Sequence, residues 1–287
     1  MGFFLLSLSI LSFGISNCLW VIPFRQFTFL QVIVLRSFLT SCFFAIILAV
    51  LSFTKILVVP MASFDIVDIA IAILISVFSF FGLYFFVQSL KFEKVSLAVP
   101  VSSISGVFGV LTGIVIFQEL VSVKFFAACL FVLVGVNIVN VKSLSTFRLS
   151  RGVWYNLVAA FFWGVSFALF HFPVKALGAI VFSFILELTV FISSLILLRL
   201  EKSTWTFPIN KITDRYILAL AILGFGGIVF YNLALTYIPV TQASFLGVLT
   251  PVVSIIAASF LYKEKLTVKQ YLGITLIIIA LMLVKLN

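Results

Sequence analysis

The chain has 287 residues, of which 64% are hydrophobic and only 9% are charged, whereas a typical soluble domain carries about 25% charged residues. This composition excludes an ordinary soluble domain, because the apolar surface is far larger than a core could bury. The net charge of +10 is interpreted as loop charge under the positive-inside rule, so no nucleic-acid partner is expected.

Charge-free segments mark the predicted membrane spans, since about 20 apolar residues cross a bilayer. In chain order they are residues 1–24, 37–54, 69–90, 95–118, 125–141, 152–170 and 176–198, the last interrupted by Glu187. Residues 216–262 are long enough for two spans, with a break at Tyr237-Ile238-Pro239, and residues 270–284 close the series. The sequence predicts an all-α polytopic membrane protein with ten transmembrane helices.

The two halves of the chain repeat one another. The stretch "FGISNCLWVIP" from Phe13 aligns with "WGVSFALFHFP" from Trp163 at a shift of 150 residues. Further along, Gly82 aligns with Gly227 at a shift of 145 residues. Each half therefore contains five of the ten predicted helices.

The repeat predicts the domain organisation. Residues 1–142 form the first five-helix repeat, 143–150 a linker and 151–287 the second repeat. Because five is an odd number, the second half enters the membrane from the opposite side, which makes the halves inverted repeats. Such repeats are typical of transporters that work by alternating access; the alternative is an inversion that only records how the protein was assembled.

Three short motifs occur in the same order in both halves: "FGIS" and "WGVS", "SLKFEKVSLA" and "ALTYIPVTQA", and "QELVSVK" and "KEKLTVK". Together they resemble the EamA-type transporters of the drug/metabolite transporter superfamily, over essentially the whole chain. The first copy departs from the family pattern, with Phe13 in place of Trp and Gln118-Glu119 in place of Gly-Glu. The resemblance implies a transporter, and members of the family carry amino acids, sugars, nucleotide derivatives and drugs.

Charge placement and loop length bear on orientation and location. The loops after helices 1, 3, 5, 7 and 9 hold 14 of the 18 Lys and Arg residues, so the positive-inside rule places both termini outside, whereas relatives are commonly drawn with the termini inside. The short loops favour a plasma or inner membrane. We expect lipid and a small-molecule substrate as partners, and a monomer with a dimer as the alternative.

Ionisable residues inside a span are candidates for function, because they are costly in the bilayer. Glu187 lies about ten residues from either end of its helix, roughly 15 Å deep, and must be neutral, paired or in a water-filled cavity. A proton-coupling or cation-binding role is weighed against a structural carboxyl. Arg36 is close to the repeat equivalent of Glu187 and could be a snorkelling anchor or part of the site. His171, near a membrane edge, could be an interfacial side chain or a ligand.

Polar and polar-tipped residues within the spans are the candidate substrate contacts. They are Asn17, Tyr84, Gln88, Trp163, Phe167, Tyr231 and Asn232. Following the family, the cavity is expected between helices 1, 3 and 4 of one half and 6, 8 and 9 of the other, with helices 5 and 10 peripheral. The Gly109-x-x-x-Gly113 motif of helix 4 suits close packing or a sliding surface.

Other classes of function find little support. The sequence offers few candidate catalytic residues for an intramembrane enzyme, because there is no His-Glu-x-x-His or Gly-x-Ser-x-Gly motif and only one mid-membrane acid. Cys18, Cys42 and Cys129 are scattered singly, so neither a metal nor a cofactor is expected. A receptor or scaffold is disfavoured by the two inverted halves. A flippase for a lipid-linked substrate is the alternative within transport.

Overall fold

The computed structural model describes residues 1–54, 65–93, 98, 101–102, 104–140, 150–201, 214–263 and 267–283, and in these ranges the chain is helical without strands. Six of the helices are α1 (Gly2–Leu19), α2 (Phe29–Phe53), α3 (Ile66–Ser89), α7 (Arg151–Leu169), α9 (Ala179–Leu200) and α10 (Arg215–Ala234). The others are η1 (Pro23–Arg25), α5 (Ser105–Phe117), α6 (Val123–Asn140), α8 (His171–Leu177), α11 (Val240–Gly247), α12 (Thr250–Tyr262) and α13 (Val268–Leu283).

Seven helical segments of the described chain are long and apolar enough to cross a membrane. They are α1 with η1, α2, α3, α7 with α8, α9, α10, and α11 with α12. Three shorter apolar segments lie in α5, α6 and α13. This is the architecture of a polytopic membrane protein, in which helices satisfy their backbone polar groups within each segment. Of the predicted linker at 143–150, only Ser150 is among the described residues.

Polar residues between the apolar runs begin the helices. Thr28 and Gln31 form a capping box at the start of α2, and the Asp214 carboxylate accepts hydrogen bonds from the N–H groups of Tyr216 and Ile217 at the start of α10. Each cap satisfies backbone donors that the first turn of a helix leaves free. These caps fix the starts of α2 and α10 just outside their apolar segments.

Two predicted boundaries have different outcomes. The expected break at Tyr237-Ile238-Pro239 is confirmed, since α10 ends at Ala234 and α11 begins at Val240. The expected start of the second span at residue 37 is wrong, because α2 begins at Phe29 and carries Arg36 inside it, 5% exposed. Arg36 therefore does not belong to the loop in which the charge count placed it.

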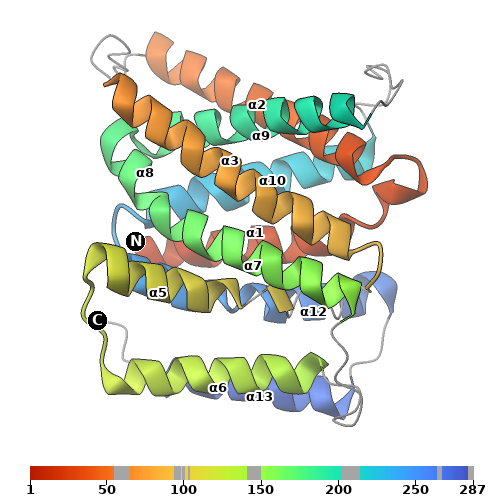
Figure 1. Cartoon of the computed structure of the whole chain (residues 1–287), viewed down its shortest axis with the longest axis vertical. Coiled ribbons are helices and arrows are strands. Elements are labelled where there is room, and N and C mark those ends of the chain that lie inside the picture. Colours follow the sequence, from red (N-terminus) through yellow and green to blue (C-terminus); the bar gives the residue numbers. More distant parts are fainter. Residues whose placement is uncertain are drawn as a thin grey trace.

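The main helix contacts join the first half of the chain to the second. Helix α1 packs on α10, and α3 packs on α7; α2 pairs with α9, and α6 with α13. Helices α5 and α12 lie between the α6–α13 pair and the rest of the molecule (Figure 1). The apolar cluster that includes Val110, Phe125, Val252 and Ile277 connects these layers. The core is thus built between the two halves.

Two glycines allow close contacts at repeat-related places. A Cβ on Gly82 of α3 would lie 2.4 Å from Cδ1 of Trp163, and one on Gly227 of α10 would lie 2.6 Å from Cε1 of Phe13. Trp163 and Phe13 are themselves equivalent in the repeat. Each half therefore places an aromatic ring of its first helix in close contact with a glycine of the other half, and this sets where the two rings lie.

Candidate functional site

A cavity of about 140 Å³ lies between the helices of the two halves. Its walls come from α1, α3 and α5 of the first half and α7, α10, α11 and α12 of the second. These are the expected walls, and α6 and α13 contribute none of the lining residues, as expected for peripheral helices. Helices α2 and α9, which were not among the expected walls, add Arg36 and the three residues Leu186, Glu187 and Val190.

The charged residues of this cavity are Arg36 and Glu187, and they form a salt bridge. Nη1 of Arg36 donates a hydrogen bond of 2.8 Å to Oε2 of Glu187. The two side chains are only 7% and 1% exposed, and Nε of Arg36 has no partner within the described chain. Glu187 is therefore paired, one of the three conditions under which a carboxylate can exist at that depth, and it borders the cavity.

Gly224 of α10 provides the space for the guanidinium of Arg36. A Cβ at this position would lie 2.0 Å from Nη2 and 2.7 Å from Nε of Arg36. The α10 backbone thus covers one edge of the guanidinium and leaves Nη1 facing Glu187. Helices α2, α9 and α10 together fix the orientation of the ion pair.

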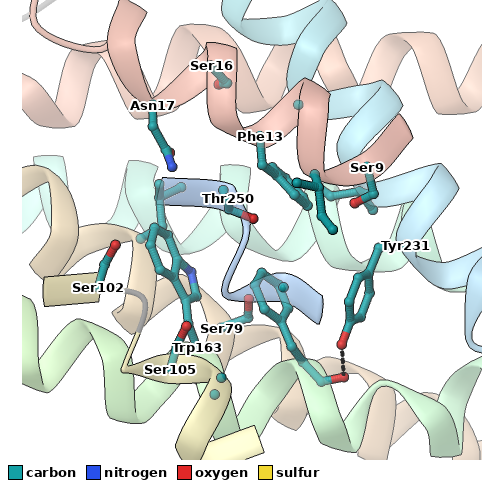
Figure 2. A pocket seen from close by; sticks show the side chains of 18 of the residues that line it. Ser9, Phe13, Ser16, Asn17, Ser79, Ser102, Ser105, Trp163, Tyr231 and Thr250 are labelled. Carbon is teal, nitrogen blue, oxygen red and sulfur yellow. Dashed lines mark hydrogen bonds between the residues drawn. The ribbon is translucent and has the colours of Figure 1, made fainter. Parts of the chain in front are cut away.

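Aromatic rings form one wall of the cavity. Phe167 stacks between Phe13 and Trp163, with ring centroids 6.1 Å and 6.2 Å away and interplanar angles of 27° and 8°. Tyr231 packs at 5.2 Å from Phe167, and its hydroxyl donates to the Phe167 carbonyl oxygen at 3.3 Å, the dashed contact in Figure 2. Such a wall presents ring faces on which an apolar group can stack.

Polar side chains lie around the same space. Figure 2 shows Asn17, Ser79, Ser105 and Thr250 around Trp163, and all four line the cavity. Within the described chain, their amide and hydroxyl groups make no hydrogen bonds to other side chains or to the backbone. Because polar groups in a membrane interior usually find partners, these are available to water or to a bound molecule.

Six of the predicted site residues line the cavity, and four do not. Those in the lining are Asn17, Arg36, Trp163, Phe167, Glu187 and Tyr231. Gln88 donates to the Tyr84 hydroxyl at 3.0 Å, away from the cavity. Asn232 is fully buried and donates to Oγ of Ser183 at 2.9 Å. The ring of His171 lies 5.2 Å from that of Phe117, at the start of α8.

The serines of the lining were missed by the sequence analysis, which favoured larger polar groups. Ser79 and Ser105 carried no periodic signal of their own, because small hydroxyl residues are frequent in membrane helices. Among the described residues, no group of three or more His, Cys, Asp or Glu could hold a metal ion.

Comparison with known proteins relates the second half of the chain to a family of transporters. A protein-family model described as the EamA-like transporter family matches residues 150–286, and this family is part of the drug/metabolite transporter superfamily. Residues 150–286, just under half of the chain, thus match the EamA-like transporter family. The chain is accordingly a multi-pass membrane protein, and its relatives point to transport rather than catalysis.

Solved structures share the fold of the chain. One, described only as a crystal structure of a protein, has 15% sequence identity and a TM-score of 0.70, over 96% of each chain. At this identity the match shows a shared fold alone. A comparison with curated protein sequences gives no match.

The departure of this EamA-like chain from the family motif has a structural counterpart. Gln118 ends α5 in the left-handed conformation, with φ 53° and ψ 31°. Lys263, its repeat equivalent, ends α12 with φ 53° and ψ 32°. The glycine of the Gly-Glu pattern adopts this conformation without steric cost. Gln118 accepts the same backbone turn and so keeps Glu119 in place.

Proposed function

We propose that the protein transports a small polar or amphipathic metabolite, such as an amino acid, by alternating access between two inverted repeats. The observation that carries the proposal is the cavity between the halves, with an aromatic wall on one side and the Arg36–Glu187 pair on another. A buried site that offers both kinds of surface suits a molecule with an apolar body and a polar head.

The ten-helix inverted arrangement is supported by how the helices pair. Seven described helices are long enough to cross a membrane, and the proposal takes the three shorter apolar segments as the remaining crossings. Exchanging each helix for its repeat equivalent turns the α1–α10 contact into the α7–α3 contact and the α1–α12 contact into the α7–α5 contact. The α2–α9 and α6–α13 pairs map onto themselves. This exchange of contacts supports a two-fold axis between the halves.

The charge of the cavity bears on the substrate. Arg36 and Glu187 cancel one another, so an isolated anion or cation would lose its hydration without meeting a net opposite charge. A molecule that carries both charges, or neither, avoids this cost. An amino acid carries both and can also place an apolar side chain against the aromatic wall of the cavity.

Proton coupling through Glu187 belongs to the same proposal. A proton on this carboxyl would remove its charge and loosen the bond to Arg36, which ties protonation to the packing of α2 against α9. The cell or inner membrane is the proposed location, and a monomer the proposed functional unit.

The alternative substrate, a lipid-linked molecule for flipping, fits the cavity less well. A volume of about 140 Å³ is close to the roughly 150 Å³ that accommodates benzene, and a lipid headgroup with its linker is much larger.

Transport by the purified protein tests the proposal. The protein is reconstituted in proteoliposomes after a thermal-shift screen of zwitterionic, cationic, anionic and neutral metabolites. We expect zwitterions with small apolar side chains to stabilise the protein and to be accumulated or exchanged. Accumulation of none of them above protein-free liposomes would refute a transporter of this class, and movement of lipid-linked sugars instead would favour the flippase.

A further inference from the structure

Glu119 makes a contact between the two halves that the substrate cavity does not explain. Its Oε1 accepts a hydrogen bond from the N–H of Val240, and its Oε2 accepts one from the N–H of Thr241, each at 2.8 Å. Both donors lie in the first turn of α11, which belongs to the other half of the chain. One carboxylate thus holds two backbone amides more than 120 residues away in sequence.

This contact replaces a missing local cap. The residue before α11 is Pro239, which provides no side-chain hydrogen bond. The amides of Val240 and Thr241 would otherwise be free donors at the start of a helix. A carboxylate at a helix N-terminus is also favoured by the helix dipole. The start of α11 is therefore satisfied only while Glu119 stays in contact with it.

The two helices joined in this way form a wall of the cavity. Helix α11 lines it through Ala243 and Ser244, and α5 through Ser105. The helices approach closely at Gly113, where a Cβ would lie 2.7 Å from Cγ2 of Thr241. Glu119 follows α5 directly and sits at the end of this contact. Separating α5 from α11 at that end would require the Glu119 bonds to break.

We propose that Glu119 is a latch that holds one mouth of the cavity closed by capping α11 across the interface between the halves. This inference rests on the proposed transport function, because the latch has a purpose only if the mouth opens in the cycle. Glu119 is a positioning residue that acts on α11 and does not contact the substrate.

Sided labelling tests the latch without any substrate. The three cysteines Cys18, Cys42 and Cys129 are replaced, and Ala243→Cys, in the cavity wall three residues after the start of α11, serves as the reporter. A membrane-impermeant maleimide is added from the membrane face on which Glu119 lies. We expect Glu119→Gln to raise the labelling rate roughly tenfold, since two charge-assisted hydrogen bonds to the closed state are weakened.

Asp214→Asn is the matched control. Asp214 also caps a helix with its carboxylate, but it caps α10 from the adjoining residue and joins nothing across the halves. We expect it to lower thermal stability as Glu119→Gln does, while labelling of the reporter stays within about twofold of the parent. Equal labelling in the Glu119→Gln and parent proteins would overturn the latch and leave a cap with a structural role.

A cross-link provides a second test, which also serves if Glu119→Gln does not fold. In the same cysteine-free background, Glu119→Cys and Thr241→Cys are joined by a short bifunctional thiol reagent. Loss of transport on cross-linking and its return on reduction are the expected results. Cross-linked protein that transports at the uncross-linked rate would overturn the latch. Absence of transport in every protein, with labelling raised as expected, would count against the proposed function instead.

Discussion

Arg36 and Glu187 meet across the two halves of the chain, with Nη1 of one 2.8 Å from Oε2 of the other. They are 151 residues apart, only one residue from the shift of 150 that relates the early parts of the repeats. Positions that are equivalent under a two-fold axis meet where that axis passes between them. In the proposed two-fold arrangement the pair would lie next to the axis, where α2 packs on α9.

The first prediction concerns the stability of this pair. Arg36→Gln or Glu187→Gln leaves one buried charge without its partner, and we expect a loss of about 3–5 kcal/mol. The charge-exchanged protein Arg36→Glu/Glu187→Arg and the neutral Arg36→Gln/Glu187→Gln protein should each recover most of that loss. Thermal unfolding in detergent measures the effect. Single variants as stable as the parent would mean that water in the cavity already solvates both charges.

The second prediction concerns pH. If Glu187 couples protons to transport, Glu187→Gln should abolish the pH dependence of the transport rate, measured per folded molecule in proteoliposomes with an imposed pH gradient. The double variant Arg36→Gln/Glu187→Gln should also lose the pH dependence of the transport rate, and it leaves no buried charge without a partner. A wild-type pH profile in both variants would assign the pair a structural role only.

The third prediction concerns the space around Arg36. Gly224→Ala brings a methyl group into contact with the guanidinium, so we expect it to displace Arg36 and to lower stability by about 1–3 kcal/mol. Gly247→Ala is the control, because a Cβ there meets no atom within 4 Å, although the residue also lines the cavity. The two melting temperatures decide the matter. Equal values would show that α10 can shift to accommodate the extra atom.

The fourth prediction concerns the turn before the latch. Because Gln118 has φ 53°, Gln118→Gly should stabilise the protein by about 1 kcal/mol. Val115→Gly, at an exposed position inside α5, should destabilise it by a similar amount, since glycine is a poor helix former. A melting temperature that falls in both variants would indicate that the Gln118 side chain has a contact of its own.

Much of the fold could be predicted from charge spacing, because a membrane span excludes charge along about 20 residues. The rule worked for α3, for α9 and for the break before Val240, where the chain leaves the apolar layer. It failed at Arg36 for a physical reason. In the sequence alone, a buried cation cannot be distinguished from a cation in a loop. Only the contact of Arg36 with Glu187 in the structure shows that Arg36 is buried.

The site was less predictable than the fold. Tyr231 and Asn232 were both expected to contact substrate, but neighbours on a helix point about 100° apart, and only Tyr231 lines the cavity. Asn232 bonds Ser183 instead. Which face of a helix turns inward depends on its partners, and these come from the other half of the chain. The repeat identified equivalent positions without stating the distances between them.

The pairing of helices across the halves has a consequence for biosynthesis. A helix of the first half reaches the membrane well before its partner has been translated, and α6 must wait for α13, which ends the described chain. Until then the small and polar faces of α1, α2 and α5 lie against lipid or against an insertion factor. The membrane-inserted but unassembled chain is thus an obligatory stage. If translation stops before residue 268, α13 is not made and α6 has no α13 to pack against.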